Sequence, residues 1–136
     1  MVVLAAVSFL VVLCIVETLD TSQVLLLCSE ETSVSNNSMG RVKDVIHDVL
    51  EHTANTKAGN NYYAHQLCYR QEEQCDGFQE LYGHGECTVT LSAEDCKTCL
   101  GEANRQLFDQ CTERMGAQIQ LMDCRLRYEK YDFTDD

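Results

Sequence analysis

Apolar residues recur at helical spacing in two stretches of the chain. In the first stretch they stand at positions i, i+3, i+4, i+7 and i+8, which is the pattern of one buried helix face. These positions are Val42, Val45, Ile46, Val49 and Leu50. We expect Ser38, at the end of the polar loop formed by residues 29–38, to cap this helix and the helix to end near Thr53.

The second helical stretch follows residues 92–95, whose sequence Ser-Ala-Glu-Asp resembles a capping box with aspartate in place of the usual glutamate. The helix is expected to end before Gly116. Its predicted buried face consists of Cys96, Cys99, Leu100, Ala103, Leu107 and Phe108.

Three further stretches have the character of strands, two in the middle of the chain and one near its end. Residues 62–70 are rich in aromatic side chains, and residues 71–77 are expected to turn the chain. Residues 78–91 form a second strand region, in which Gly83 and Gly85 predict a bend or a bulge. Two helices on one face of an antiparallel sheet, an α+β fold, is the simplest arrangement of these elements.

The last predicted element, residues 118–131, changes the phase of its apolar positions partway along. Ile119 and Leu121 belong to one alternation, whereas Met122 and Cys124 continue in another. Either both faces of this strand are partly covered, or a bulge lies near Met122 and Asp123.

The N-terminus carries an apolar run over residues 2–16, interrupted only by Ser8 and ended by Glu17 and Asp20. This length fits the core of a signal peptide and is shorter than the roughly 20 residues of a membrane-spanning helix. We therefore predict a signal peptide over residues 1–22, cleaved between residues 17 and 24, and a single domain over residues 23–136. An uncleaved membrane anchor is the alternative.

The charge of the chain limits its partners. Twenty-two Asp and Glu residues face ten Lys and Arg residues, which gives a formal net charge of −12. This sign disfavours binding to nucleic-acid phosphates and the behaviour of a cationic membrane-active peptide. We expect no nucleic-acid partner and, once the signal peptide is removed, no membrane span.

Nine cysteines in 136 residues are far more than usual, and Cys14 lies within the predicted signal peptide. The eight that remain form an even set, which in a secreted domain indicates a disulfide framework. Asn36 begins an Asn-Asn-Ser triplet in the polar loop and is a candidate N-glycosylation site, whose occupancy the sequence leaves open.

Cys87, Cys96 and Cys99 form a dense cluster with the spacing C-x8-C-x2-C. A zinc site would normally need a second C-x2-C or a closely spaced histidine pair, and the four histidines (His47, His52, His65 and His84) are scattered and expected at the surface. A redox role is a second alternative, although Cys96 lies too far past the helix cap for the helix dipole to lower its thiol pKa much. Structural disulfides are the favoured interpretation, with no metal and no cofactor.

The C-x8-C-x2-C spacing resembles the signature of the ginkbilobin-like, or stress-antifungal, domain family of plant cysteine-rich secretory proteins. The resemblance covers about residues 24–134. Further matching residues are Cys28, Tyr82-Gly83, Leu91-Ser92, Cys111, Gly116-Ala117, Gln120-Leu121, Cys124, Tyr128-Glu129 and Phe133.

The resemblance implies a fold and a set of disulfides. It implies two helices packed on one face of a five-stranded antiparallel sheet. The implied bridges are Cys28–Cys111, Cys87–Cys96 and Cys99–Cys124. Cys68 and Cys75 fall outside the usual six cysteines; because they flank the predicted turn, we expect them to pair across a hairpin.

The resemblance also implies a function. Members are secreted defence proteins, and the founding type is an antifungal, lectin-like protein that binds mannose through no catalytic motif. We therefore expect a protein of the apoplast that binds mannose-type glycans and is not an enzyme. The residues that bind sugar in the family are an Asn, an Arg and a Glu, and this chain has Ser29, Gln118 and Glu129 at those positions, so only Glu129 keeps the family residue type. The expected partner is a mannose-containing cell-wall glycan. The alternative is an apoplastic interaction module without a sugar site, whose partner is a cell-surface protein; a protease inhibitor is a weaker alternative that rests only on small size and many cysteines.

Overall fold

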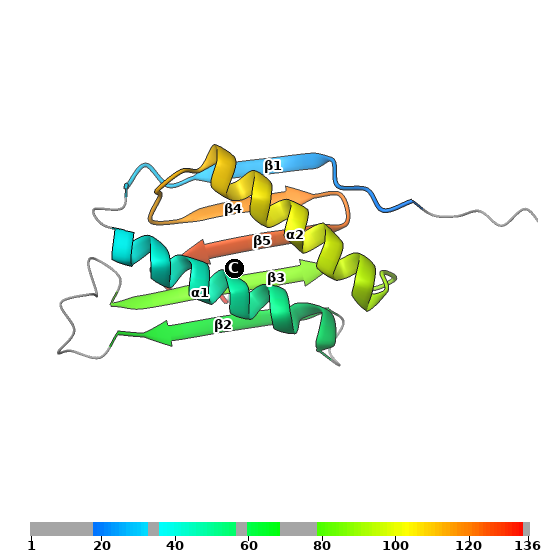
Figure 1. Cartoon of the computed structure of the whole chain (residues 1–136), viewed down its shortest axis with the longest axis horizontal. Coiled ribbons are helices and arrows are strands. Elements are labelled where there is room, and N and C mark those ends of the chain that lie inside the picture. The colour runs from blue at the N-terminus through cyan, green and yellow to red at the C-terminus, as the bar shows by residue number, and fades with distance from the viewer. Residues whose placement is uncertain (1–17, 33–35, 57–59, 69–78, 135–136) are drawn as a thin grey trace, which may run out of the picture.

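The structure is a computed structural model that describes residues 18–32, 36–56, 60–68 and 79–134. Within these residues, two helices cover one face of a five-stranded antiparallel sheet (Figure 1), which confirms the predicted α+β fold. The strand order is β1-β4-β5-β3-β2. In chain order the elements are β1 (Gln23–Cys28), α1 (Asn36–His52), the 3-10 turn η1 (Thr53–Asn55), β2 (Asn61–Leu67), β3 (Glu80–Cys87), α2 (Ala93–Gln110), β4 (Ala117–Leu121) and β5 (Cys124–Glu129).

The predicted apolar face of α1 lies in the core, but the predicted start of this helix is wrong. Val42, Val45, Ile46 and Val49 are at most 2% exposed. The helix already begins at Asn36, so Ser38 stands inside its first turn, where the side chain is fully buried, and does not cap it. Asn36 is therefore the first residue of α1 rather than part of a loop; its side chain lies outside the described part of the structure, and its glycosylation stays a prediction.

The predicted cap of α2 is confirmed. The Ser92 hydroxyl accepts a hydrogen bond of 3.1 Å from the backbone N–H of Asp95, which satisfies one of the free donors of the first helical turn. On the buried face of α2, Phe108 is half-buried, and the other predicted residues are fully buried: Cys96, Cys99, Leu100, Ala103 and Leu107.

The predicted bend in β3 is absent, because β3 pairs with β2 and with β5 in uninterrupted register. Its two glycines instead allow α1 to approach the sheet. A Cβ atom at Gly83 would lie 2.6 Å from a methyl carbon of Val45, and one at Gly85 would lie 2.5 Å from the Thr53 hydroxyl.

The single last strand that the sequence predicted is two strands. β4 and β5 form a hairpin in which Gln120 lies opposite Arg125, so the chain reverses at Met122 and Asp123. The change of apolar phase marks this turn, since each of the two strands keeps its own alternation of buried and exposed residues.

Three disulfides join the sheet to α2 and to the residue that follows it. They are Cys28–Cys111, Cys87–Cys96 and Cys99–Cys124, as the resemblance implied. Cys96 and Cys99 are thus bonded to different partners, so the zinc and redox interpretations of this pair are wrong. Cys68 is also disulfide-bonded, whereas its expected partner Cys75 and the predicted turn over residues 71–77 lie outside the described residues.

The predicted signal peptide lies almost wholly outside the described residues, which begin at residue 18. None of the helices in the described ranges has the length and apolar character needed to cross a bilayer.

Candidate functional site on the open face of the sheet

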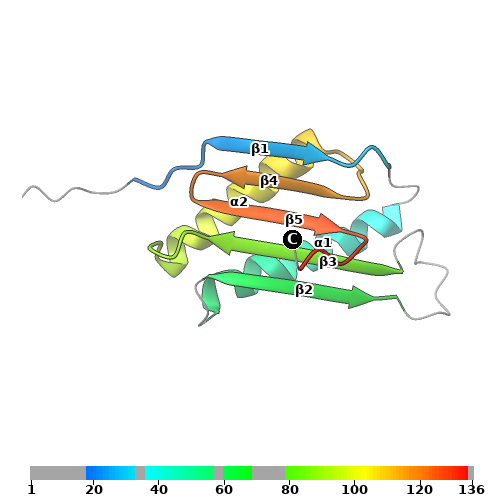
Figure 2. The same ribbon diagram turned by 180° about the vertical axis from the view of Figure 1, so that it is seen from behind.

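The sheet has a face that the helices do not cover, here called the open face (Figure 2). Because side chains alternate along each strand, the strand register arranges those of the open face in rows across the sheet. Two adjacent rows run from β1 through β4, β5 and β3 to β2. The first is Leu25, Gln120, Arg125, Glu86 and Asn61, and the second is Leu27, Gln118, Arg127, His84 and Tyr63.

The structure brings together the three residues that the resemblance assigned to sugar binding. They lie at one corner of the open face, where β1 and β5 end and β4 begins. The backbone N–H of Ser29 donates a hydrogen bond of 2.8 Å to the carbonyl of Gly116. The Glu129 carboxylate lies against Gly116 so closely that any side chain there would collide with it. Gln118 follows Gly116 by two residues on β4.

Two of these three residues already have partners within the protein. The Glu129 carboxylate is 13% exposed and accepts a hydrogen bond of 3.2 Å from Nε of Arg127. Burial raises the pKa of the Glu129 carboxyl, and the Arg127 guanidinium opposes this rise. The Ser29 hydroxyl accepts a bond of 3.2 Å from the backbone N–H of Glu31. The half-buried amide of Gln118 has no hydrogen-bond partner among the described residues.

The segment after β5 folds back across the open face, and its last described residues lie over the middle of the sheet (Figure 2). Phe133 is 5% exposed and lies over the Arg127 guanidinium, whose carbon is 4.2 Å from the ring centroid. The Phe133 and His84 rings meet in a T-shaped arrangement at a centroid distance of 6.5 Å. Phe133 therefore covers Arg127 on the open face. The position of Phe133 in the sequence does not predict this contact.

His84 is buried, contrary to the expectation that all four histidines lie at the surface. Its ring is 5% exposed, stacks on Tyr63 at 4.1 Å and contacts the Asn61 side-chain oxygen through Nε2 at 2.6 Å. Burial, together with the positive charges of Arg125 and Arg127, lowers the pKa of His84 to about 4, against the smaller opposing effect of Glu86. The imidazole is therefore neutral at physiological pH, so it donates or accepts a hydrogen bond but carries no charge.

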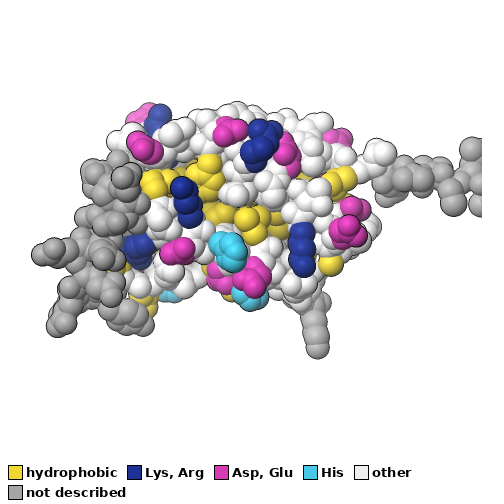
Figure 3. All heavy atoms as spheres, viewed as in Figure 1, with side chains coloured by type: hydrophobic (Ala, Val, Ile, Leu, Met, Phe, Trp, Pro, Cys, Tyr) yellow, Lys and Arg dark blue, Asp and Glu magenta, His cyan; other side chains and the backbone are white. Residues whose placement is uncertain are grey.

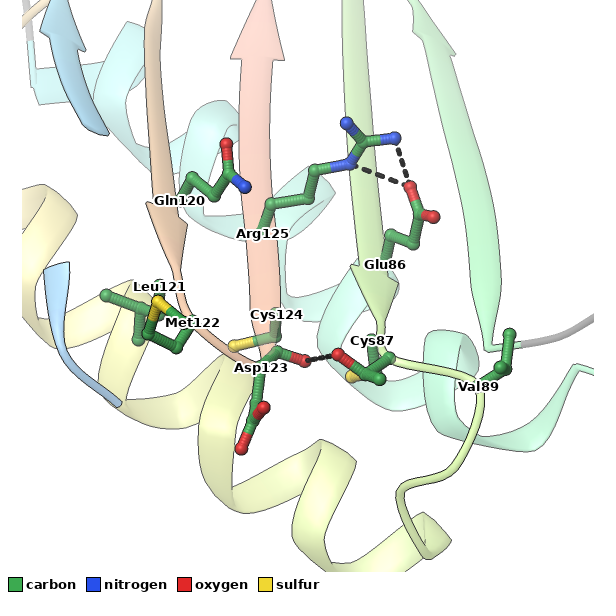
Figure 4. A pocket seen from close by; sticks show the side chains of 10 residues that line it. Glu86, Cys87, Val89, Gln120, Leu121, Met122, Asp123, Cys124 and Arg125 are labelled. Atoms are coloured by element: carbon green, nitrogen blue, oxygen red, sulfur yellow. Dashed lines mark hydrogen bonds and ion pairs between the residues drawn. The ribbon is translucent and has the colours of Figure 1, made fainter. Parts of the chain in front are cut away.

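Two neighbouring hollows lie on the open face beside this corner. The smaller one, of about 90 Å³, extends from Phe133 to Gln120 and Arg125. The larger one, of about 240 Å³, continues from Gln120 and Arg125 to the β4–β5 turn (Figure 4). Together they offer a polar groove that begins beside the predicted sugar-binding corner.

The helix side of the molecule carries a hollow of different character. Figure 3 shows apolar side chains gathered between the two helices, where a hollow of about 330 Å³ is lined by Ile46, Leu50 and Phe108. The described ranges contain no group of three or more His, Cys, Asp or Glu side chains placed to hold a metal ion.

Fold and disulfides together define the class of this protein: a disulfide-linked α+β domain with one covered and one open sheet face. The model of the salt stress response/antifungal family matches residues 27–131, so the chain belongs to this family, the ginkbilobin-like domain family that its cysteine spacing resembles. The description of this family and the names of the relatives are those of antifungal proteins and not of a known enzyme family.

Two named relatives are similar in sequence to part of this chain. An antimicrobial ginkbilobin-2-like protein of Castanea crenata is 35% identical over 81 residues, which cover 59% of this chain and 34% of the relative. The antifungal protein ginkbilobin-2 of Ginkgo biloba is 35% identical over 57 residues, which cover 42% of each chain. The matched segments thus span less than half the length of either relative.

A solved structure shares the fold. The tandem DUF26 ectodomain of the Arabidopsis thaliana cysteine-rich receptor-like protein PDLP8 superimposes with a TM-score of 0.69 at 21% identity. The match covers 82% of this chain and 51% of that one.

Proposed function

We propose that this protein is a secreted plant defence protein of the apoplast, antifungal, that acts by lectin-like binding of mannose-type cell-wall glycans. Relatives that carry the names antimicrobial and antifungal support the defence role. Stable disulfides form in oxidising compartments, which agrees with secretion. The proposed ligand site is the corner formed by Ser29, Gln118 and Glu129.

The observation that carries the proposal is the amide of Gln118, which has no partner among the described residues and lies beside the Arg127–Glu129 ion pair. Gln118 and Arg127 lie directly opposite each other on β4 and β5. The Arg127 guanidinium lies next to the position where the family has its arginine, but Phe133 covers it and it donates hydrogen bonds to Glu129 and Tyr131, so it orients the Glu129 carboxylate and does not itself face a ligand. The Gln118 amide, the Ser29 hydroxyl and the Glu129 carboxylate together offer fixed donors and acceptors, which match sugar hydroxyls because each hydroxyl both donates and accepts.

Calorimetric titration of the purified domain with mannose tests this proposal. We expect measurable heat at millimolar mannose, its loss in Glu129→Ala, and about fivefold weaker binding in Gln118→Ala, the cost of one neutral hydrogen bond. Gln110→Ala is the control: it removes an exposed amide at the end of α2 that donates a hydrogen bond of 2.9 Å to Gln23 and lies outside the corner. Absence of heat from the wild-type protein, with its circular dichroism intact, would overturn mannose binding.

One observation favours the alternative, an apoplastic interaction module without a sugar site. β1 stands at the edge of the sheet, with Val24, Leu25 and Leu27 exposed by 54%, 40% and 51%. An apolar edge strand offers backbone groups and side chains to an extended segment of a partner protein. In that case, binding of a cell-surface protein would protect the backbone amides of β1 from hydrogen exchange, and Leu27→Lys would prevent this protection. Titration with mannose would then give no heat.

A further inference from the structure

We infer that the groove running from Gln118 past Gln120 and Arg125 to the β4–β5 turn binds further units of a neutral glycan chain, so that the ligand is an oligosaccharide and not a single sugar. This inference rests on the proposed function in taking the ligand to be a glycan. It assigns binding roles to Gln120 and Arg125, which lie outside the corner of Ser29, Gln118 and Glu129.

Continuity of the groove is the first argument. The two hollows of the open face share Gln120 and Arg125, and the larger one lies on the side away from Glu129. Gln118 and Gln120 are two residues apart on the same strand, which separates their side chains by about 7 Å. This spacing is comparable to the length of one pyranose unit, so a chain that starts at the corner would place its next units over Gln120 and beyond.

Unsatisfied polar groups are the second argument. The amides of Gln118 and Gln120 have no hydrogen-bond partner in the described part of the chain. Arg125 uses Nε and Nη2 on a single oxygen of Glu86, and the remaining Nη1 points away from that carboxylate (Figure 4). Gln120 and Arg125 lie directly opposite each other on β4 and β5. They therefore present two donor nitrogens and one acceptor oxygen side by side to a ligand in the groove.

Charge decides which kind of glycan fits. Arg125 is paired with Glu86, and Arg127 is paired with Glu129, so each guanidinium of the groove is already neutralised. The whole chain carries a net charge of −12. A carboxylated or sulfated sugar would meet no uncompensated positive charge there. Hydrogen bonds to neutral hydroxyls do not need such a charge, so a neutral glycan fits the groove better.

Apolar side chains complete the groove. Leu25, 40% exposed, lines the smaller hollow, and Met122 and Val89, 56% and 74% exposed, line the larger one. Sugars have apolar C–H faces as well as hydroxyls, so a groove with both free amides and exposed apolar groups suits a carbohydrate better than a small ion.

The test is a titration series with mannose and with linear mannan oligosaccharides of two, three and four units. We expect the affinity of the wild-type protein to rise about tenfold from mannose to the trisaccharide. Gln120→Ala and Arg125→Ala should each remove most of this gain and leave the affinity for mannose itself unchanged within about twofold. The control Gln110→Ala should keep the full gain in affinity. Gln120→Ala should leave the fold intact, because the Gln120 side chain has no hydrogen-bond partner among the described residues.

The outcomes separate this inference from the proposed function. Equal affinity for all chain lengths, or a gain that persists in both groove variants, overturns the inference even if mannose binds through Glu129. Oligosaccharide binding that requires Gln120, without detectable heat from mannose, supports the groove and overturns the monosaccharide site. Tighter binding of a uronic acid oligomer than of the neutral one, with strong weakening by salt, contradicts the neutral ligand.

Discussion

At the scale of single residues, His84 differs most from what its sequence context indicates. It stands between two glycines on β3, yet Tyr63, Phe133 and Asn61 enclose its ring. Burial and the nearby arginines keep the imidazole neutral, with a pKa of about 4 against an ordinary value of 6.5. The unfolded chain thus takes up a proton at a higher pH than the folded protein does.

This difference predicts how stability depends on pH. Because the folded-state pKa of His84 is lowered, its contribution is complete above pH 6.5 and is lost as the pH falls toward 4, by about 3 kcal/mol in total. Urea unfolding at neutral and acidic pH should show that His84→Gln reduces this pH dependence by a similar amount. His47→Gln, at an exposed ring on α1 far from the open face, is the control. Identical pH profiles for the wild-type protein and His84→Gln would contradict the prediction.

At the scale of elements, the distance between α1 and the sheet depends on the glycines of β3. Gly83 and Gly85 lie beneath Val45 and Val49, so the helix packs directly on the strand backbone. The same alternation places Tyr82, His84 and Glu86 on the open face. Close helix packing on one side and a row of polar and aromatic side chains on the other are thus properties of one strand.

We predict that Gly83→Ala lowers the free energy of unfolding by about 1–3 kcal/mol, since its methyl group would lie 2.6 Å from a Val45 carbon and 3.0 Å from a Val49 carbon. Gly101→Ala is the control. Gly101 lies in α2 with open space where a Cβ would stand, so alanine there should stabilise the protein by about 0.5–1 kcal/mol. Chemical denaturation measures both, and a neutral Gly83→Ala would show that α1 can move away from the sheet at little cost.

At the scale of the whole molecule, the disulfides join segments that are far apart in the chain. Cys28–Cys111 spans 83 residues and ties the edge strand β1 to the end of α2, whereas Cys87–Cys96 spans nine. The open face lies on β1, β4, β5, β3 and β2 together, so its shape depends on these covalent links as well as on the core.

Reduction should therefore unfold the domain, and the bridges should differ in their effect. In the chain-entropy description, removing Cys28–Cys111 costs about 4.6 kcal/mol, Cys99–Cys124 about 3.5 kcal/mol and Cys87–Cys96 about 2.7 kcal/mol. Paired Cys→Ser variants, compared by denaturant midpoint, should follow this order. Near-UV circular dichroism that survives full reduction, or a reversed order of the variants, would argue against loop closure as the main contribution.

The sequence predicted the parts of the fold that repeat a local pattern. The apolar stripes placed the buried faces of α1 and α2, and Ser92 and Asp95 fixed the start of α2. The family resemblance gave the three disulfide pairings and brought Ser29, Gln118 and Glu129 into consideration. Local patterns failed where two interpretations share one signal, as at Met122 and Asp123, where a turn and a bulge both shift the alternation.

The sequence alone thus determined a disulfide-linked α+β domain, because helix periodicity and cysteine spacing are properties of neighbours in the chain. Only the tertiary structure decided which side chains on the open face are free. Arg127 is held by Glu129 beneath Phe133, while Gln120 and Nη1 of Arg125 face the groove. These differences arise from strand register and from the fold-back of the segment after β5, which bring together residues that the sequence keeps apart.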